Sequence, residues 1–240
     1  LVVASANPED YTNRGRIITP LKDRFGAEIR THYPRELEAE VGVISQEAHL
    51  TAKVPDYLLQ IVARFARYLR ESTSVDQRSG VSARFAIAAA ETVAASARHR
   101  GALLGEADPV ARVVDLGTVI DVLRGKLEFE SGEEGREQAV LEHLLRRATA
   151  DTAQKALGGI DVAPLLAAVE AGSAVTTGEQ VPAKDVLAAL PGLPVIDTIA
   201  ERLGARTDGE RAAALELALE ALYLAKKLDK TTGDGETTYG

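Results

Sequence analysis

The chain has 240 residues, with 28 basic and 36 acidic side chains and a net charge of −8 at pH 7. Hydrophobic residues make up 45% and charged residues 27%, which is typical of a soluble globular protein. The absence of cysteine excludes disulfides, zinc–thiolate sites and cysteine nucleophiles. No run of about eighteen apolar residues and no signal-peptide pattern occurs, so we expect a cytoplasmic protein without a membrane span.

Histidine is too scarce and too dispersed to predict a metal site. None of the four histidines has the spacing of a metal-ligand pair. We expect all of them to be surface or packing residues: His32, His49, His99 and His143.

The amino-terminal residues predict a buried strand. Residues 1–6 form a short, apolar, β-branched run. A buried parallel strand requires neighbouring strands and covering helices, yet almost everything after residue 35 has helical periodicity. We therefore expect a further part of the protein before Leu1. A turn at 7–10 and a basic stretch follow, and residues 27–33 alternate like a second strand.

From Arg35 onward the spacing of apolar residues predicts a mainly α fold. Asp208 is expected to cap the last helix, and residues 231–240, including Tyr239, are expected to form a loose polar tail. The expected helices cover residues 36–41, 45–49, 54–71, 80–100, 110–123, 136–152, 161–171, 182–190, 193–203 and 208–229.

A change in charge predicts a boundary near residue 105. Glycines and a proline interrupt the helical pattern between Gly101 and Pro109. Residues 1–105 carry 14 basic and 12 acidic side chains, whereas residues 106–240 carry 14 and 24. The two parts are therefore expected to face different surroundings.

Two sequence motifs follow each other in an informative order. Residues 2–30 are VVASANPEDYTNRGRIITPLKDRFGAEIR, in which the predicted strand ends at the polar Asn7 and a P-L-K-D-R-F-G motif contains Arg24. Residues 78–84 are RSGVSAR, which places Arg84 60 residues after Arg24 and at the start of a predicted helix. In both motifs the chain resembles AAA+ ATPases of the magnesium-chelatase motor subunit and MoxR-like class.

The resemblance implies a role for each motif in ATP hydrolysis. Asn7 would be the sensor 1 residue, whose amide holds the attacking water, or simply a turn residue at a strand end. Arg24 would be an arginine finger that reaches the γ-phosphate held by the neighbouring subunit, or a surface arginine paired with Asp23. Arg84 would be the sensor 2 arginine of the lid, with Arg78 as the rival for that role, or an exposed arginine at a helix start.

The basic connector supplies weaker candidates for a contact between subunits. Arg14 and Arg16, together with Asp23, are expected at a subunit interface under this resemblance. A solvated loop explains the same residues equally well.

The resemblance also implies an architecture and cofactors. It predicts the end of an α/β AAA+ core, with one or two strands, at residues 1–35, a helical lid at 36–105 and an acidic helical extension at 106–240. Gly125–Gly135 is the most recognisable piece of the extension, and we assign it no chemical role. ATP and Mg²⁺ are the implied cofactors. Both would be bound mainly by residues before Leu1, since the chain lacks a G-x-x-x-x-G-K-[ST] loop and a convincing magnesium-binding strand.

The expected function is ATP hydrolysis in a ring, expected to be a hexamer, that remodels a partner. The resemblance names a von Willebrand factor A domain protein or a chelatase subunit as candidate partners. A non-catalytic acidic helical protein-interaction module and a DNA-acting AAA+ protein are the alternatives. The net charge of −8, the 4% aromatic content and the lack of a basic stripe argue against a nucleic-acid partner.

Overall fold

The computed structural model describes residues 2–5, 23–76, 80–172 and 174–240. The chain divides into two compact units, Leu1–Pro34 and Arg35–Gly240. The expected border between residues 105 and 106 lies inside the second unit.

The two strands predicted near the amino terminus are not formed by the described residues. Residues 2–5 and 27–33 belong to neither a helix nor a strand and are exposed, and Ile29 is 85% exposed. A strand is stable only when a neighbouring strand accepts and donates its backbone hydrogen bonds. No described segment pairs with residues 2–5 or 27–33, so neither predicted strand is formed in the described part of the chain.

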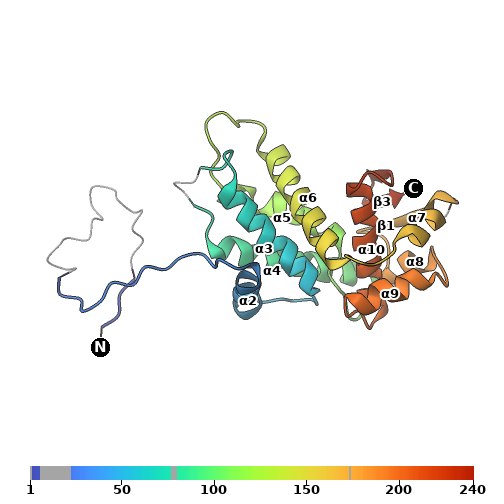
Figure 1. Cartoon of the computed structure of the whole chain (residues 1–240), viewed down its shortest axis with the longest axis horizontal. Coiled ribbons are helices and arrows are strands. Elements are labelled where there is room, and N and C mark those ends of the chain that lie inside the picture. Colours follow the sequence, from blue (N-terminus) through green and yellow to red (C-terminus); the bar gives the residue numbers. More distant parts are fainter. Residues whose placement is uncertain (1, 6–22, 77–79, 173) are drawn as a thin grey trace. The chain divides into compact units, whose positions relative to one another are not determined.

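The described residues contain nine α-helices, all within Arg35–Gly240, and the first five form a bundle (Figure 1). The bundle surrounds an apolar core in which the rings of Phe65 and Phe85 lie 6.0 Å apart between centroids. The helix Ala83–Leu104 contributes mainly alanines to this core, and their small side chains allow close packing. We call these helices the helical bundle: α2 (Leu37–Glu47), α3 (Asp56–Glu71), α4 (Ala83–Leu104), α5 (Gly117–Leu123) and α6 (Glu137–Ala156).

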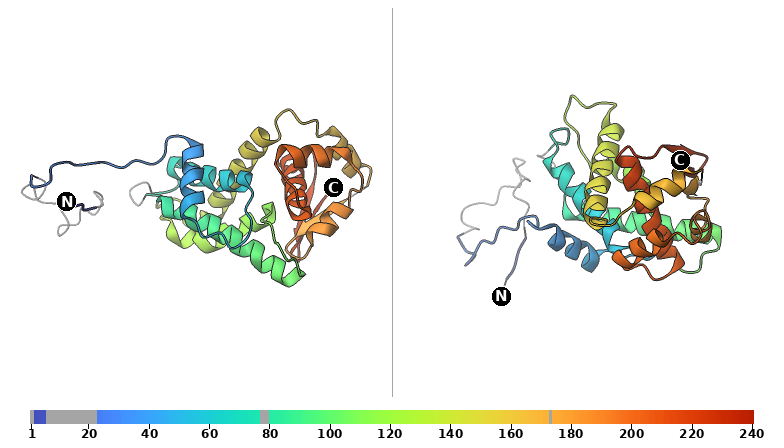
Figure 2. Two further views of the ribbon diagram at one scale, coloured as in Figure 1. Left: turned by 90° about the horizontal axis from the view of Figure 1, so that it is seen from below. Right: turned by 45° about the vertical axis from the view of Figure 1, so that its right-hand side comes forward.

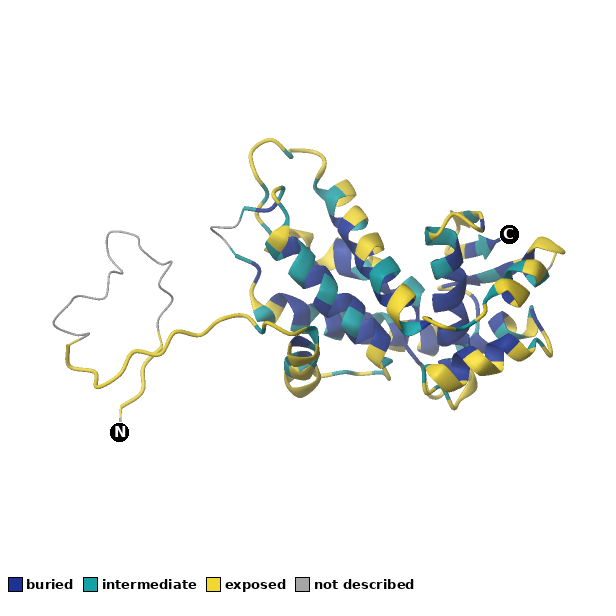
Figure 3. Cartoon of the chain, in the orientation of Figure 1, coloured by how far each residue is buried: buried dark blue, intermediate teal, exposed yellow. Residues whose placement is uncertain are grey.

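The remaining elements form a second group, which we call the C-terminal lobe (Figure 2). Helix α10 is its centre, because most of its own residues are buried, as the colouring of its ribbon shows (Figure 3). The three strands pair antiparallel in the order β1-β3-β2. The elements of the lobe are α7 (Ala163–Glu170), β1 (Val175–Gly178), α8 (Ala183–Ala188), α9 (Pro194–Arg202), α10 (Asp208–Leu224), β2 (Lys230–Gly233) and β3 (Glu236–Tyr239).

Periodicity predicts most helices to within a few residues of their observed bounds. Two predictions differ in kind. The expected pair of helices at 36–41 and 45–49 is one helix, α2. The expected helix at 110–123 is a 3₁₀ turn, η1 (Val113–Leu116), followed by the short α5.

The start of α10 also differs from the prediction. Its N-cap is Thr207, whose hydroxyl accepts a hydrogen bond from the Glu210 backbone N–H, while the Glu210 carboxylate accepts one from the Thr207 backbone N–H. This reciprocal capping box satisfies two amides that the helix leaves unpaired. Asp208 is the first residue of the helix and not its cap.

The expected loose tail is instead a β-hairpin. Asp234 and Gly235 connect β2 to β3, and both have positive φ angles, as a tight hairpin turn requires. Tyr239 is 1% exposed, and its hydroxyl donates a hydrogen bond of 2.5 Å to Glu220 on α10. Burial and the Glu220 carboxylate both raise the pKa of Tyr239, so the phenol remains a donor. Residues 231–240 are therefore part of the packed lobe.

The substitution Tyr239→Phe should lower the free energy of unfolding by about 2 kcal/mol, because it removes the donor to a buried carboxylate. Urea denaturation followed by circular dichroism measures this loss. Tyr223→Phe is the matched control, since Tyr223 is half-buried on α10 and its hydroxyl has no hydrogen-bond partner among the described residues. Equal losses in the two variants would contradict the assigned role of Tyr239.

Candidate functional site

The structure describes three of the residues singled out from the sequence. Asp23 and Arg24 lie in an exposed turn of the unit Leu1–Pro34 and do not form an ion pair with each other. Arg84 lies on α4, in the other unit. The other candidates lie outside the described residues: Asn7, Arg14, Arg16 and Arg78.

Arg84 is an exposed cation in the first turn of α4. The N-cap Ser82 makes no side-chain capping hydrogen bond, and this turn contains no acidic residue. Arg84 forms no ion pair with any residue that the structure describes. A helix N-terminus already carries partial positive charge, and an added cation makes this end of α4 a favourable place for an anion.

The backbone before α4 is fixed by two neighbours. Val81 is buried, and its carbonyl accepts a 2.8 Å hydrogen bond from Nε of Arg70 on α3. Farther back, Val75 forms an isolated β-bridge with Phe129, and Ser74 donates its hydroxyl hydrogen to Glu133 at 2.8 Å. Phe129 and Glu133 belong to the piece Gly125–Gly135, which therefore holds Ser74 and Val75 in place.

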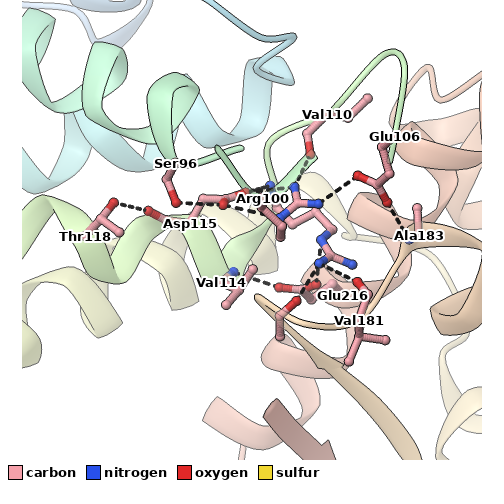
Figure 4. Close-up of polar contacts among 12 residues, drawn as sticks. Ser96, Arg100, Glu106, Val110, Val114, Asp115, Thr118, Val181, Ala183 and Glu216 are labelled. Atoms are coloured by element: carbon pink, nitrogen blue, oxygen red, sulfur yellow. Dashed lines mark hydrogen bonds and ion pairs between the residues drawn. The ribbon is translucent and has the colours of Figure 1, made fainter. Parts of the chain in front are cut away.

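Near the other end of α4 lies a buried polar cluster (Figure 4). The Arg100 guanidinium donates to the Asp115 carboxylate at 3.1 Å and to the Val110 carbonyl at 2.7 Å. It also forms an ion pair of 3.0 Å with Glu106. Ser96, one turn before Arg100, donates its hydroxyl hydrogen to Asp115 at 2.9 Å. These contacts attach η1 and the preceding loop to α4.

Arg112 extends the cluster from the bundle into the C-terminal lobe. Its Nη2 donates to the carbonyls of Gly178 at 2.6 Å and Val181 at 2.9 Å, both at the carboxyl end of β1. Its Nε lies 3.6 Å from the Glu216 carboxylate of α10, and Arg112 and Glu216 are each only 1% exposed. Glu216 also accepts a 2.7 Å hydrogen bond from the backbone N–H of Val114 in η1.

Burial acts on both members of this pair. Desolvation lowers the pKa of Arg112, and the Glu216 carboxylate opposes that change. Desolvation raises the pKa of Glu216, while Arg112 and the Val114 N–H oppose it. The contact between the two side chains is an ion pair and not a hydrogen bond, because Nε and Nη1 of Arg112 and Oε2 of Glu216 have no hydrogen-bond partner among the described residues. A buried charge without its counter-charge is strongly unfavourable, so each member depends on the other. Neither Arg112 nor Glu216 is a site candidate by sequence, because burial of a charge has no local sequence signal.

A cleft of about 510 Å³ lies where α6, α10, η1 and the sheet meet. Glu216 and Glu220, one turn apart on α10, line one wall. The opposite wall carries a row of threonines that the strand register places side by side: Thr177, Thr237 and Thr232. Glu220 forms an ion pair of 2.7 Å with Lys230, so both carboxylates that α10 contributes to the cleft have a cationic partner. Glu179, which follows β1, also lines the cleft.

Two kinds of site receive no support from the described part of the chain. The described residues bring no group of three or more His, Asp or Glu side chains together in a way that could hold a metal ion. Among them there is also no helix with the length and apolar character needed to cross a membrane.

In comparisons with known proteins, no protein family, no curated protein and no solved structure matches the chain.

A second contact between bundle and lobe gives a pH-dependent prediction. Glu210 forms an ion pair with Lys53 and accepts hydrogen bonds from the backbone N–H groups of Arg206 and Thr207. Burial alone raises the pKa of Glu210, but these partners lower it to about 2 from the usual 4.5. The stabilisation is therefore complete above pH 4.5 and disappears as the pH falls toward 2.

We expect the free energy of unfolding to fall between pH 4.5 and 2 in the unmodified protein and to fall less in Glu210→Gln. Thermal melts at a series of pH values measure the difference. Identical pH profiles for the two proteins would contradict the role of the Glu210 carboxylate.

Proposed function

We propose that this chain is the sensor, lid and C-terminal helical portion of a magnesium-chelatase-like AAA+ ATPase. In this proposal ATP hydrolysis in a ring remodels a partner protein or a chelatase complex. The observation that supports it is Arg84, an exposed arginine without an ion-pair partner among the described residues, at the uncapped start of a long helix. The two motifs around Arg24 and Arg84 supply the resemblance on which the family is proposed.

The chemistry of Arg84 suits a nucleotide phosphate. A guanidinium is permanently charged and forks onto two phosphate oxygens. The first N–H groups of α4 point toward the same end of the helix and add hydrogen-bond donors. Phosphate binding there would relieve the unfavourable placement of a cation at a helix N-terminus.

Arg24 has the second role in the proposal. Its guanidinium is exposed and is not paired with Asp23. In a ring it would neutralise charge on the γ-phosphate bound by the neighbouring subunit, while Asn7 orients the attacking water. Bound ATP and Mg²⁺ would supply the phosphoryl group and a counter-charge.

If the experiments below showed no role in ATP hydrolysis, a non-catalytic acidic interaction module would be the better proposal. Its support is the excess of acidic residues after residue 105. The module would bind its partner with equal affinity in the presence and absence of nucleotide. A DNA-acting protein would instead bind duplex DNA with strong salt dependence.

Arg84→Ala in the complete protein should weaken ATP binding by about tenfold to a hundredfold, since a hydrogen bond to a charged group contributes roughly 1.5–3 kcal/mol. Titration with a fluorescent ATP analogue measures the dissociation constant. Arg98→Ala is the matched control, because Arg98 is exposed on the same helix and has no ion-pair partner among the described residues. Equal dissociation constants for the two variants would contradict the role of Arg84.

Arg24→Ala should lower ATP turnover by about a thousandfold and leave ATP binding nearly unchanged, because an arginine finger acts on the transition state. Steady-state phosphate release measures turnover, with the exposed Arg30→Ala as the control. Mixing Arg24→Ala subunits with subunits that cannot bind ATP should restore part of the activity if the site is shared. Unchanged turnover in Arg24→Ala would rule out the finger.

A further inference from the structure

Helix α4 carries a functional candidate near each end. Arg84 lies in its first turn, and Arg100 lies in its last turns. Arg100 lies 16 positions after Arg84, which corresponds to about 24 Å along the helix axis. Arg84 is exposed, whereas Arg100 is buried in the polar cluster that continues to Arg112 and Glu216.

We infer that this cluster couples α4 to the C-terminal lobe, so that the two move together and Arg112 and Glu216 are positioning residues for Arg84. The link to nucleotide rests on the proposed function of Arg84. The mechanical coupling itself does not, because it depends only on contacts among residues 96–216.

The first step of the coupling is the attachment of η1 to α4. Asp115 is fully buried and accepts hydrogen bonds from the Ser96 hydroxyl, the Arg100 guanidinium and the Arg112 backbone N–H. Three donors from two segments hold one carboxylate. In addition, a Cβ on Gly101 would lie 2.5 Å from Cβ of Pro109, so α4 packs directly against the loop that leads to η1.

The second step is the attachment of η1 to the lobe. Arg112, the N-cap residue of η1, donates to the carbonyls of Gly178, the last residue of β1, and of Val181. The Val114 N–H of η1 donates to Glu216. Gly178, which supplies one of those carbonyls, has a φ of +131°, and a Cβ there would lie 2.3 Å from the Gly235 carbonyl oxygen. Arg112 therefore holds a turn that is itself packed against the β2–β3 hairpin.

The third step is the cost of separation. If α4 rotated away from the lobe, Arg112 or Glu216 would be left buried without its partner, which is strongly unfavourable in a low-dielectric interior. A joint movement of α4, η1 and the lobe breaks none of these contacts. Because coupling is reciprocal, a partner that binds the lobe would also change the affinity of the Arg84 site for nucleotide.

Glu220 is a buried carboxylate of the lobe that is comparable to Glu216 but takes no part in the contacts with the bundle. It is buried on the same face of α10 as Glu216, one turn later. Its partners, Tyr239 and Lys230, both belong to the lobe. Glu220→Gln should therefore perturb the lobe alone, which makes it a matched control for Glu216→Gln.

Amide hydrogen exchange of the nucleotide-free protein tests the coupling from both ends. Glu216→Gln should speed exchange at residues 95–104 of α4 by about tenfold, whereas Glu220→Gln should speed exchange only in the lobe. Conversely, Ser96→Ala should speed exchange at 175–178 of β1. Thr92→Ala should not, because the Thr92 hydroxyl bonds only within α4, to the Ala88 carbonyl.

Two results would overturn the inference. One is an equal effect of Glu216→Gln and Glu220→Gln on exchange in α4. The other is unchanged exchange at residues 95–104 in Glu216→Gln together with unchanged exchange at residues 175–178 in Ser96→Ala. If Glu216→Gln does not fold, the pair Ser96→Ala and Thr92→Ala decides alone, since each removes one hydroxyl from a half-buried position.

A second experiment separates this inference from the proposed function. In the complete protein, ATP should change exchange at residues 175–178, and Ser96→Ala should reduce that change. If ATP binds through Arg84 but exchange in β1 does not respond, the transmission of nucleotide state to the lobe is refuted and the proposed function stands. If Arg84→Ala leaves ATP binding unchanged, the proposed function fails, and the nucleotide-free experiment still decides the coupling.

Discussion

The burial of the Arg112 guanidinium is the constraint on which the rest of the structure depends. A cation with 1% exposure must find its partners within the protein, because water cannot solvate it. Arg112 finds them in the lobe, at Glu216 and at the carbonyls of Gly178 and Val181. The bundle supplies the arginine and the lobe supplies its partners, so neither part satisfies its buried groups without the other.

The two ends of α4 differ in how their charges are placed. At Arg100 the guanidinium and Asp115 are buried, Glu106 is partly buried, and all three charges are paired, so the helix is fixed to its surroundings. At Arg84 the charge is exposed and has no ion-pair partner among the described residues. A rigid helix that is anchored at one end and presents a free cation at the other is suited to detect a phosphate and to pass the response on. The Gly125–Gly135 piece holds Ser74 and Val75, which follow α3.

Sequence reasoning predicted what depends on local periodicity and missed what depends on tertiary partners. The stripe Leu58, Ile61, Phe65 and Leu69 predicts α3 because every third or fourth residue faces the core. The hairpin at 230–239 was missed because its strands are short and polar, although the Asp234–Gly235 pair was a usable turn signal. Residues 2–5 and 27–33 have strand-like sequences but no pairing partner among the described segments. For the candidate site, the sequence identified Arg84 by its motif but not the cluster, since nothing near Arg112 or Glu216 in the sequence distinguishes them from surface charges.

Arg112 and Glu216 act on each other across the junction of bundle and lobe. A double-mutant cycle with Arg112→Met, Glu216→Leu and the double variant measures this directly through the free energies of unfolding. We predict a coupling energy of about 2 kcal/mol, with the double variant more stable than the sum of the single losses implies. Additivity within about 0.5 kcal/mol would show that the two residues act independently and would contradict the account.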